Sequence, residues 1–482
     1  MSRELMWQAR YAKKSWYRWV MFATVVTGTF MVNIDSSIMN VAIPVLEHEF
    51  HAGPEVLQWV ISAYLLVITG ILPIVGSMSD RLNRKTVFIV GVTVFTGGSV
   101  LCAFSENVTQ LIVFRVLQSV GGSLIMGNVM SIVSYIFPAG QRGRPLGLVG
   151  SVVAAGTIVG PALGGIFISL YGWRSVFWVN VPIGIVSVVA SLLVLLPILS
   201  GGPRKNFDIV GSALFFVGIV SLMLVISEGQ TWGWTSVTSL LVLAVSGLTL
   251  ITFVRQEMTC ESPVIDLSLF RSGTFTLGNL AGYLSYIMMM MPGFLLPLYM
   301  HDVLHISTAH MGLLLTPQAI SMILFSPVGG WMADKFGVNW PATLGLLVGT
   351  LGLGLMALLN QRSSYLEIVI ALAIFGLGMG VFTSPNNVSV LESVSIEKSG
   401  LTGSLIATVR NFGRVSGVAI TVLLLQVSGH NLHSSRGFAE ASSFTFIMSV
   451  GIGLIGTFLT VSRLLMKSRI LAAAPKSKRR YD

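Results

Sequence analysis

The chain has 482 residues, of which 53% are hydrophobic and only 10% are charged, whereas soluble domains carry about 25% charged residues. This composition excludes an ordinary soluble domain. The net charge of +10 does not indicate a nucleic-acid partner, because most Lys and Arg residues lie between apolar runs, where they set orientation in a membrane.

Apolar runs recur along the whole chain, each long enough to cross a hydrocarbon core of about 30 Å. They are continuous and lack the two-residue alternation of a transmembrane β-barrel. We therefore predict an all-α polytopic membrane protein with about fourteen transmembrane helices. The expected spans are 19–44, 57–78, 86–104, 109–137, 146–170, 176–198, 209–227, 236–253, 275–300, 311–332, 342–359, 366–388, 401–427 and 444–465.

The distribution of charge predicts that both termini are cytoplasmic. Of the 29 Lys and Arg residues, 23 fall on the side of the termini, with Arg463 counted in the C-terminal tail. Only Arg174, Arg362 and Arg436 fall on the other side. Cytoplasmic segments are the ones enriched in Lys and Arg. No cleavable leader pattern precedes the first span, so we expect that span to be retained.

An internal repeat predicts two parallel halves. Residues 73–81 and 327–335 both read P-x-x-G-x-x-x-D-[R/K], with Asp80 and Asp334 at equivalent positions 254 residues apart. Transporters built from two such halves show this pattern, and eight spans fill the interval, so an extra pair separates two six-span halves. The predicted parts are a cytoplasmic N-terminus (1–18), an N-terminal half (19–199), a linker with two extra helices (200–272), a C-terminal half (273–466) and a basic tail (467–482).

Asp35 is an acid inside the first span. A carboxylate in hydrocarbon costs roughly 2.5–3.5 kcal/mol, so it is expected to face a polar cavity. At 1.5 Å per residue, Asp35 lies roughly 14 Å and Arg115 of the fourth span roughly 9 Å from the outer surface. We therefore expect the two to pair, either for proton coupling or as a purely structural ion pair.

Proton coupling is the hypothesis we favour for Asp35. Burial favours its protonated form and a nearby Arg115 its ionised form, so the acid could take up and release a proton. Met31 and Met39 lie four residues to either side and share its helix face. Polarizable thioethers beside an acid suit a bulky lipophilic cation.

The ninth span offers a second group of candidate substrate contacts. It holds Tyr283, Tyr286 and a methionine run that includes Met290. Such adaptable side chains line promiscuous pockets, although they could equally be packing or lipid-facing residues. Further candidates are Phe382 and Asn386 of the twelfth span. In the thirteenth span, Arg410 and Arg414 are assigned to the cytoplasmic gate, with a site for an anionic substrate or lipid phosphate as the alternative.

Several motifs carry a resemblance to a known family. The loop pattern with Gly76, Asp80, Arg81 and Arg84 resembles the cytoplasmic-loop signature of the major facilitator superfamily, with Asn83 where glycine is preferred. Stretches at 35–44, 172–184 and 263–270 resemble its fourteen-span drug:proton antiporter branch. The antiporter signature G-x8-G-x3-G-P-x2-G-G is matched by Gly147, Gly156, Gly160, Pro161, Gly164 and Gly165.

The resemblance implies roles for these residues. Gly156, Gly160 and Gly164 share one helix face, which permits close helix approach, and the resemblance places that face at a seam between the halves; ordinary small-residue packing is the alternative. Arg115 and Gln118 resemble the family's fourth-span signature, although Ser119 replaces a glycine. The resemblance also implies a gate at which Asp80 with Arg81, and Asp334 with Lys335, act as conformational latches.

These observations together predict a proton-coupled antiporter of the bacterial cytoplasmic membrane that exports amphipathic, often cationic, drugs by alternating access. The alternatives are an exporter dedicated to one metabolite or lipid and a non-transporting sensor or receptor. No Walker loop or Ser-His-Asp set is present, so we do not expect an enzyme. We expect a monomer whose partners are small substrates, protons and lipid, with no cofactor and no metal, because the outer-side histidines lack supporting carboxylates other than Asp302.

Overall fold

The computed structural model describes residues 14–198, 207–306, 308–431 and 434–473. This part of the chain contains 14 helices that are long and apolar enough to cross a membrane, which confirms the predicted fold class. The helices are α2 (Ser15–Phe50), α3 (Pro54–Ser79), α4 (Arg84–Ala103), α5 (Val108–Ile136), α6 (Gly143–Tyr171), α7 (Ser175–Trp178), α8 (Asn180–Val194), α9 (Ile209–Trp232), α10 (Val237–Thr259), η1 (Leu267–Arg271), α11 (Gly273–Asp302), α12 (Thr308–Phe336), α13 (Asn339–Ala357), α14 (Tyr365–Glu392), η2 (Ile396–Lys398), α15 (Ser399–Val427) and α16 (Ser435–Ala473).

Several helices extend beyond the expected apolar spans; α2, for example, ends at Phe50 rather than at residue 44, and α16 begins at Ser435 rather than at residue 444. The sixth span is α7 followed by α8, and it ends at Val194 rather than at residue 198. Leu195 is already extended, and Pro197 two residues later cannot continue the helical hydrogen-bond ladder. At the C-terminus, α16 continues to Ala473, beyond the apolar run that ends at residue 465.

The described chain divides into two compact units. Unit 1 comprises residues 14–139, 152–198, 207–267 and 394–412, and unit 2 comprises 140–151, 268–306, 308–393, 413–431 and 434–473. Unit 1 therefore includes the first turns of α15, from the C-terminal part of the sequence. Unit 2 includes the first turns of α6, from the N-terminal part. The division into two sequence halves with a linker stays a prediction.

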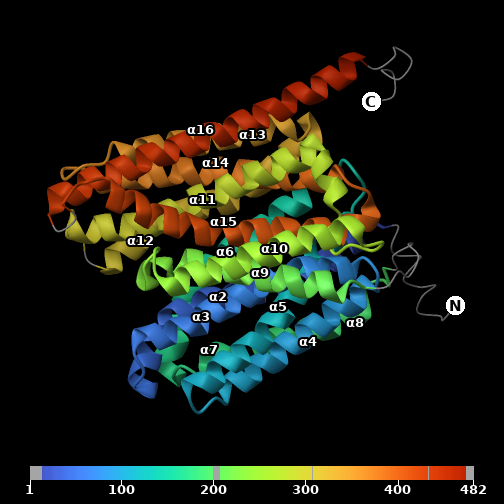
Figure 1. Cartoon of the computed structure of the whole chain (residues 1–482), viewed down its shortest axis with the longest axis horizontal. Coiled ribbons are helices and arrows are strands. Elements are labelled where there is room, and N and C mark those ends of the chain that lie inside the picture. The colour runs from blue at the N-terminus through green and yellow to red at the C-terminus, as the bar shows by residue number, and fades with distance from the viewer. Residues whose placement is uncertain (1–13, 199–206, 307, 432–433, 474–482) are drawn as a thin grey trace. The chain divides into compact units, whose positions relative to one another are not determined.

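The extra pair, α9 and α10, is held within unit 1 at both of its ends. The two helices lie side by side (Figure 1), and α9 packs on α3. At one end, Gln58 Nε2 donates to Glu228 Oε1 at 3.1 Å. At the other end, Arg81 donates to the Ser262 carbonyl at 3.1 Å, and Asp266 pairs with Lys398. The chain segment that follows α10 therefore contacts residues beside the Asp80 loop and the start of α15.

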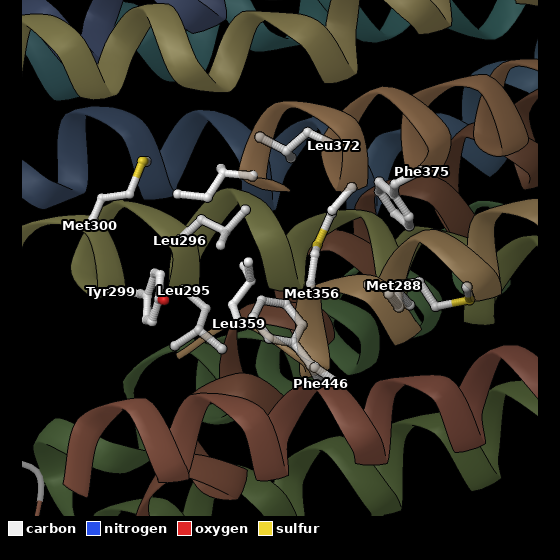
Figure 2. Close-up of a cluster of buried hydrophobic side chains, with 14 of the residues drawn as sticks. Met288, Leu295, Leu296, Tyr299, Met300, Met356, Leu359, Leu372, Phe375 and Phe446 are labelled. Atoms are coloured by element: carbon white, nitrogen blue, oxygen red, sulfur yellow. The ribbon is translucent and has the colours of Figure 1, made fainter. Parts of the chain in front are cut away.

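Unit 2 has an apolar core contributed by α11, α13, α14 and α16. Figure 2 shows Met288 and Leu295 of α11 beside Met356 of α13, Phe375 of α14 and Phe446 of α16, all of them buried. Burial of such side chains stabilises each by about 1.5–3 kcal/mol relative to exposure to water. This core fixes the helices that carry the candidate residues of unit 2.

Candidate functional site

The carboxylate of Asp35 lies at the centre of a buried polar network in unit 1. Its side chain and that of Arg115 are both 0% exposed. Asp35 Oδ2 accepts a hydrogen bond from Arg115 Nη1 at 2.6 Å. Asp35 Oδ1 accepts from Gln118 Nε2 at 2.9 Å and from Asn180 Nδ2 at 2.7 Å. The charge is thus paired, and both oxygens are occupied by donors from α5 and α8.

Arg115 is held in place by groups other than the acid. Its Nε donates to the Val60 carbonyl at 3.3 Å, and its Nη1 also donates to Gln118 Oε1 at 2.7 Å. The guanidinium lies over the ring of Tyr64, 4.1 Å from the centroid. Removing one partner of a buried pair costs about 3–5 kcal/mol, because the remaining charge has no compensation. The arrangement is therefore sensitive to the charge on Asp35.

Asn180 is a member of this network that sequence reasoning missed. Val179, between α7 and α8, keeps helical backbone angles, and Asn180 begins α8. Its amide reaches Asp35 at 2.7 Å and Ser99 Oγ of α4 at 3.2 Å. The available signal was a lone amide in the apolar W-V-N-V-P stretch. Its contact with Asp35 depends on which face of α8 packs against α2 and α4, which the apolar run does not reveal.

The glycines of α6 bring this helix close to α2, which carries Asp35. Ser37 Oγ donates to the Gly156 carbonyl at 2.8 Å. A Cβ at Gly160 would stand 1.8 Å from Ser37 Oγ, and one at Gly164 would stand 3.3 Å from Ile38, whereas Gly165 faces open space. The close approach of the two helices thus requires glycine at position 160, where α6 lies against Ser37, two residues after Asp35 in α2. It does not require glycine at position 165.

Asp80 follows α3 and caps the first turn of α15 within unit 1. Its carboxylate accepts from the backbone N–H groups of Gly400 and Leu401, both at 2.8 Å, and from Arg84 at 2.9 Å. Burial raises the pKa of Asp80 to about 6, against the opposing effect of these hydrogen bonds. An acceptor at a helix N-terminus also interacts favourably with the helix dipole. Gly76 is required nearby, since a Cβ there would stand 2.4 Å from Ser404 Oγ.

Asp334 makes the equivalent contacts within unit 2. Its two carboxylate oxygens accept from the N–H groups of Gly143 at 2.8 Å and Arg144 at 3.0 Å, at the start of α6. Its neighbour Lys335 lies over the rings of Trp331 and Phe336. Gly147, in the second turn of α6, lies against the backbone of Ser326, whose carbonyl oxygen would be 2.4 Å from a Cβ. The sequence repeat is therefore also a repeat of contacts.

The structure brings some predicted substrate contacts together and separates others. Met31 and Met39 belong to unit 1 with Asp35 and are 0% exposed. Tyr283, Tyr286 and Met290 belong to unit 2, where α11 lies against Gly413 and Gly417 of α15. Phe382 is part of the apolar core of unit 2, and Asn386 forms hydrogen bonds with the Gly278 carbonyl and with Arg463. The two arginines of α15 fall in different units: Arg410 is buried in unit 1, and Arg414 is half-buried in unit 2.

Among the described residues, no group of three or more His, Cys, Asp or Glu side chains has the arrangement of a metal site.

The sequence matches the family described as Major Facilitator Superfamily over residues 25–285 and 278–480. The chain belongs to the major facilitator superfamily. It is a multi-pass membrane transporter and not an enzyme.

This superfamily member is similar to characterised bacterial proteins along nearly its whole length. It is 34% identical over 450 residues to the riboflavin transporter RibZ of Clostridioides difficile (strain 630), covering 92% of this chain and 97% of the relative. It is 31% identical over 435 residues to the multidrug transporter protein MdtP of Bacillus subtilis (strain 168), covering 89% and 80%. Its fold matches the crystal structure of the human organic anion transporter MFSD10 (TETRAN) with a TM-score of 0.68 at 15% identity, covering 92% and 99%.

Proposed function

We propose that this transporter is a proton-coupled antiporter that exports amphipathic, often cationic, small molecules by alternating access, with both termini on the cytoplasmic side of a bacterial cytoplasmic membrane. The observation that carries the proposal is the Asp35–Arg115–Gln118–Asn180 network. It holds a single acid whose charge is balanced by one arginine in a fully buried setting. Protonation of Asp35 leaves Arg115 without a counter-charge, which favours rearrangement of the network.

The filled coordination of Asp35 supports a proton as the ligand of this acid. A cationic substrate would have to displace Arg115 or one of the two amides before it could contact the carboxylate. Met31 and Met39 are likewise covered, so their proposed contact with substrate requires a rearrangement of unit 1. The proposed sequence is therefore protonation of Asp35, rearrangement, and then substrate exchange. The paired contacts of Asp80 and Asp334 at helix starts support their role as latches in the same cycle.

Everted membrane vesicles test the proposal. A pH gradient should drive uptake of a lipophilic cationic dye by the wild-type protein and by Glu440→Gln, which changes a half-exposed acid near the start of α16. Asp35→Asn should lose gradient-driven accumulation by at least about tenfold while retaining substrate exchange without a gradient, because only the proton step is removed. Undiminished gradient-driven transport by Asp35→Asn would contradict the coupling role.

A dedicated metabolite carrier is the second candidate. It is favoured by the 34% identity over 92% of this chain to a protein named as a riboflavin transporter. Riboflavin and several unrelated dyes should therefore be compared as competitors in the same vesicles. Competition by riboflavin alone supports the dedicated carrier, whereas competition by structurally unrelated amphipathic compounds supports the multidrug exporter.

A further inference from the structure

Arg463 of α16 is a buried cation that the proposed proton site does not use. Its side chain is 2% exposed, although it lies only two residues before Leu465, where the last apolar run ends. Among the described residues Arg463 forms no ion pair, and its hydrogen-bond partner is Asn386 Oδ1, which accepts from Nη1 at 3.0 Å. A buried charge in a membrane protein is expensive without a compensating group.

The two nitrogens of Arg463 that lack a partner define the shape of the missing group. Within the described part of the chain, both Nε and Nη2 are buried and have no hydrogen-bond partner. In a guanidinium group, the N–H bonds of Nε and Nη2 point outward from the same edge, and this edge binds the two oxygens of a carboxylate or phosphate in parallel. Arg115 is different, because its Nε is used by the Val60 carbonyl.

The remaining nitrogen of the guanidinium, Nη1, is held by a small cluster in unit 2. Asn386 of α14 accepts from Arg463 and donates to the Gly278 carbonyl of α11 at 3.0 Å. Gly278 has no side chain to fill the region, and a Cβ there would stand 3.2 Å from Arg463 Nη1. The amide thus orients the guanidinium from one side and leaves the Nε–Nη2 edge for another group.

We propose that Arg463 binds an oxyanion, a carboxylate or a phosphate group, through its Nε–Nη2 edge in unit 2. The position within one helical turn of the end of the span makes two sources accessible: the phosphate of an anionic lipid headgroup, and a soluble anion that enters from the adjacent aqueous side. Both present two oxygens to the same edge. The proposal concerns binding and does not depend on proton coupling.

The test uses the full-length purified protein and measures the shift in melting temperature that ligand binding produces. In one arm, the protein in an uncharged detergent is titrated with inorganic phosphate and with benzoate, against chloride at equal ionic strength. In the other arm, it is placed in phosphatidylcholine nanodiscs with and without phosphatidylglycerol. Stabilisation in the first arm identifies a soluble anion as the ligand, and stabilisation in the second alone identifies the lipid headgroup.

Three variants and a matched control decide whether Arg463 is responsible. Arg463→Gln should bind the stabilising anion at least about tenfold more weakly, and Arg463→Lys should recover only part of that loss, because a lysine lacks the two-pronged edge. The control Arg436→Gln removes the same charge from an exposed position of α16 and should behave as wild type. If Arg463→Gln fails to fold, Asn386→Asp supplies a carboxylate beside Nη1 and should weaken anion binding in a protein that retains the arginine.

Two results would overturn the proposal. One is an absence of oxyanion-specific stabilisation of the wild-type protein in both arms. The other is unchanged anion affinity in Arg463→Gln, or in Asn386→Asp where the first variant does not fold. Asp35→Asn should bind the anion as wild type does, so that failure of proton coupling and failure of this site give different results.

Discussion

Substitution of Gly160 by alanine tests the close approach of α6 to the helix that carries Asp35. The added Cβ would stand 1.8 Å from Ser37 Oγ and 2.9 Å from Ser37 Cβ. Rotation of the serine hydroxyl relieves only the first clash, and it breaks the 2.8 Å hydrogen bond from Ser37 to the Gly156 carbonyl. The backbone of α2 or α6 must then move to relieve the second.

The expected loss of stability follows from these two effects. Overpacking of a tight contact costs about 1–3 kcal/mol, and loss of the serine hydrogen bond adds about 0.5–1.5 kcal/mol. Gly160→Ala should therefore destabilise the protein by about 2–4 kcal/mol. Gly165→Ala changes the same residue type in the same helix, but a Cβ at Gly165 meets nothing within 4 Å, so its effect should stay within about 0.5 kcal/mol.

Thermal unfolding in detergent measures the difference, with gradient-driven transport as a second readout. Gly160→Ala should melt several degrees below both the wild type and Gly165→Ala. In a Ser37→Gly background, which removes both clashing atoms, the added alanine should cost much less than in the wild type. Equal melting temperatures for the two alanine variants, or an undiminished penalty in the Ser37→Gly background, would refute the steric reasoning.

Three further outcomes are expected. The pKa of Asp80 is raised to about 6, so the folded protein binds a proton at this carboxylate more tightly than the unfolded chain does. The stability that this protonation contributes is present at low pH and is lost as the pH rises through 6. The fall in melting temperature between pH 5 and pH 7 should therefore be smaller in Asp80→Asn. Asp334→Ala removes the acceptor of two N–H groups at the start of α6 and should lower stability by about 1–2 kcal/mol in the same assay, whereas Glu440→Ala should have little effect. Lys398→Asp should lower stability by up to about 1 kcal/mol, because its pair is partly exposed, and adding Asp266→Lys should restore it; no recovery in the double variant would show that the pair contributes nothing.

Hydropathy was sufficient to predict the fold class, because each span must satisfy its own backbone hydrogen bonds within the membrane. The pairing of Asp35 with Arg115 also followed from simple depth arithmetic, since two costly charges at similar depth have no better partner. The same reasoning could not place Asn180. Its contact depends on which face of α8 packs against α2 and α4, which hydropathy does not register.

Arg463 shows the opposite error. Its position near the end of the last apolar run led us to count it in the basic tail. In the structure, α16 continues through it to Ala473, and helical periodicity turns this side chain inward toward Asn386. Which face of a helix a terminal arginine occupies is determined by the packing of neighbouring helices, here α11 and α13. The apolar run alone carries no information about that packing.

The way in which α9 and α10 are attached has a consequence for any attempt to shorten the protein. In the chain that follows α10, Arg81 finds a hydrogen-bond acceptor and Lys398 finds a counter-ion. Arg81 is next to Asp80 in the sequence, and Lys398 immediately precedes α15, the helix that Asp80 caps. A twelve-span derivative made by joining the two halves directly would leave both cations without these partners. The insertion is therefore not a detachable module, and its excision would have to be accompanied by replacement of Arg81 and Lys398.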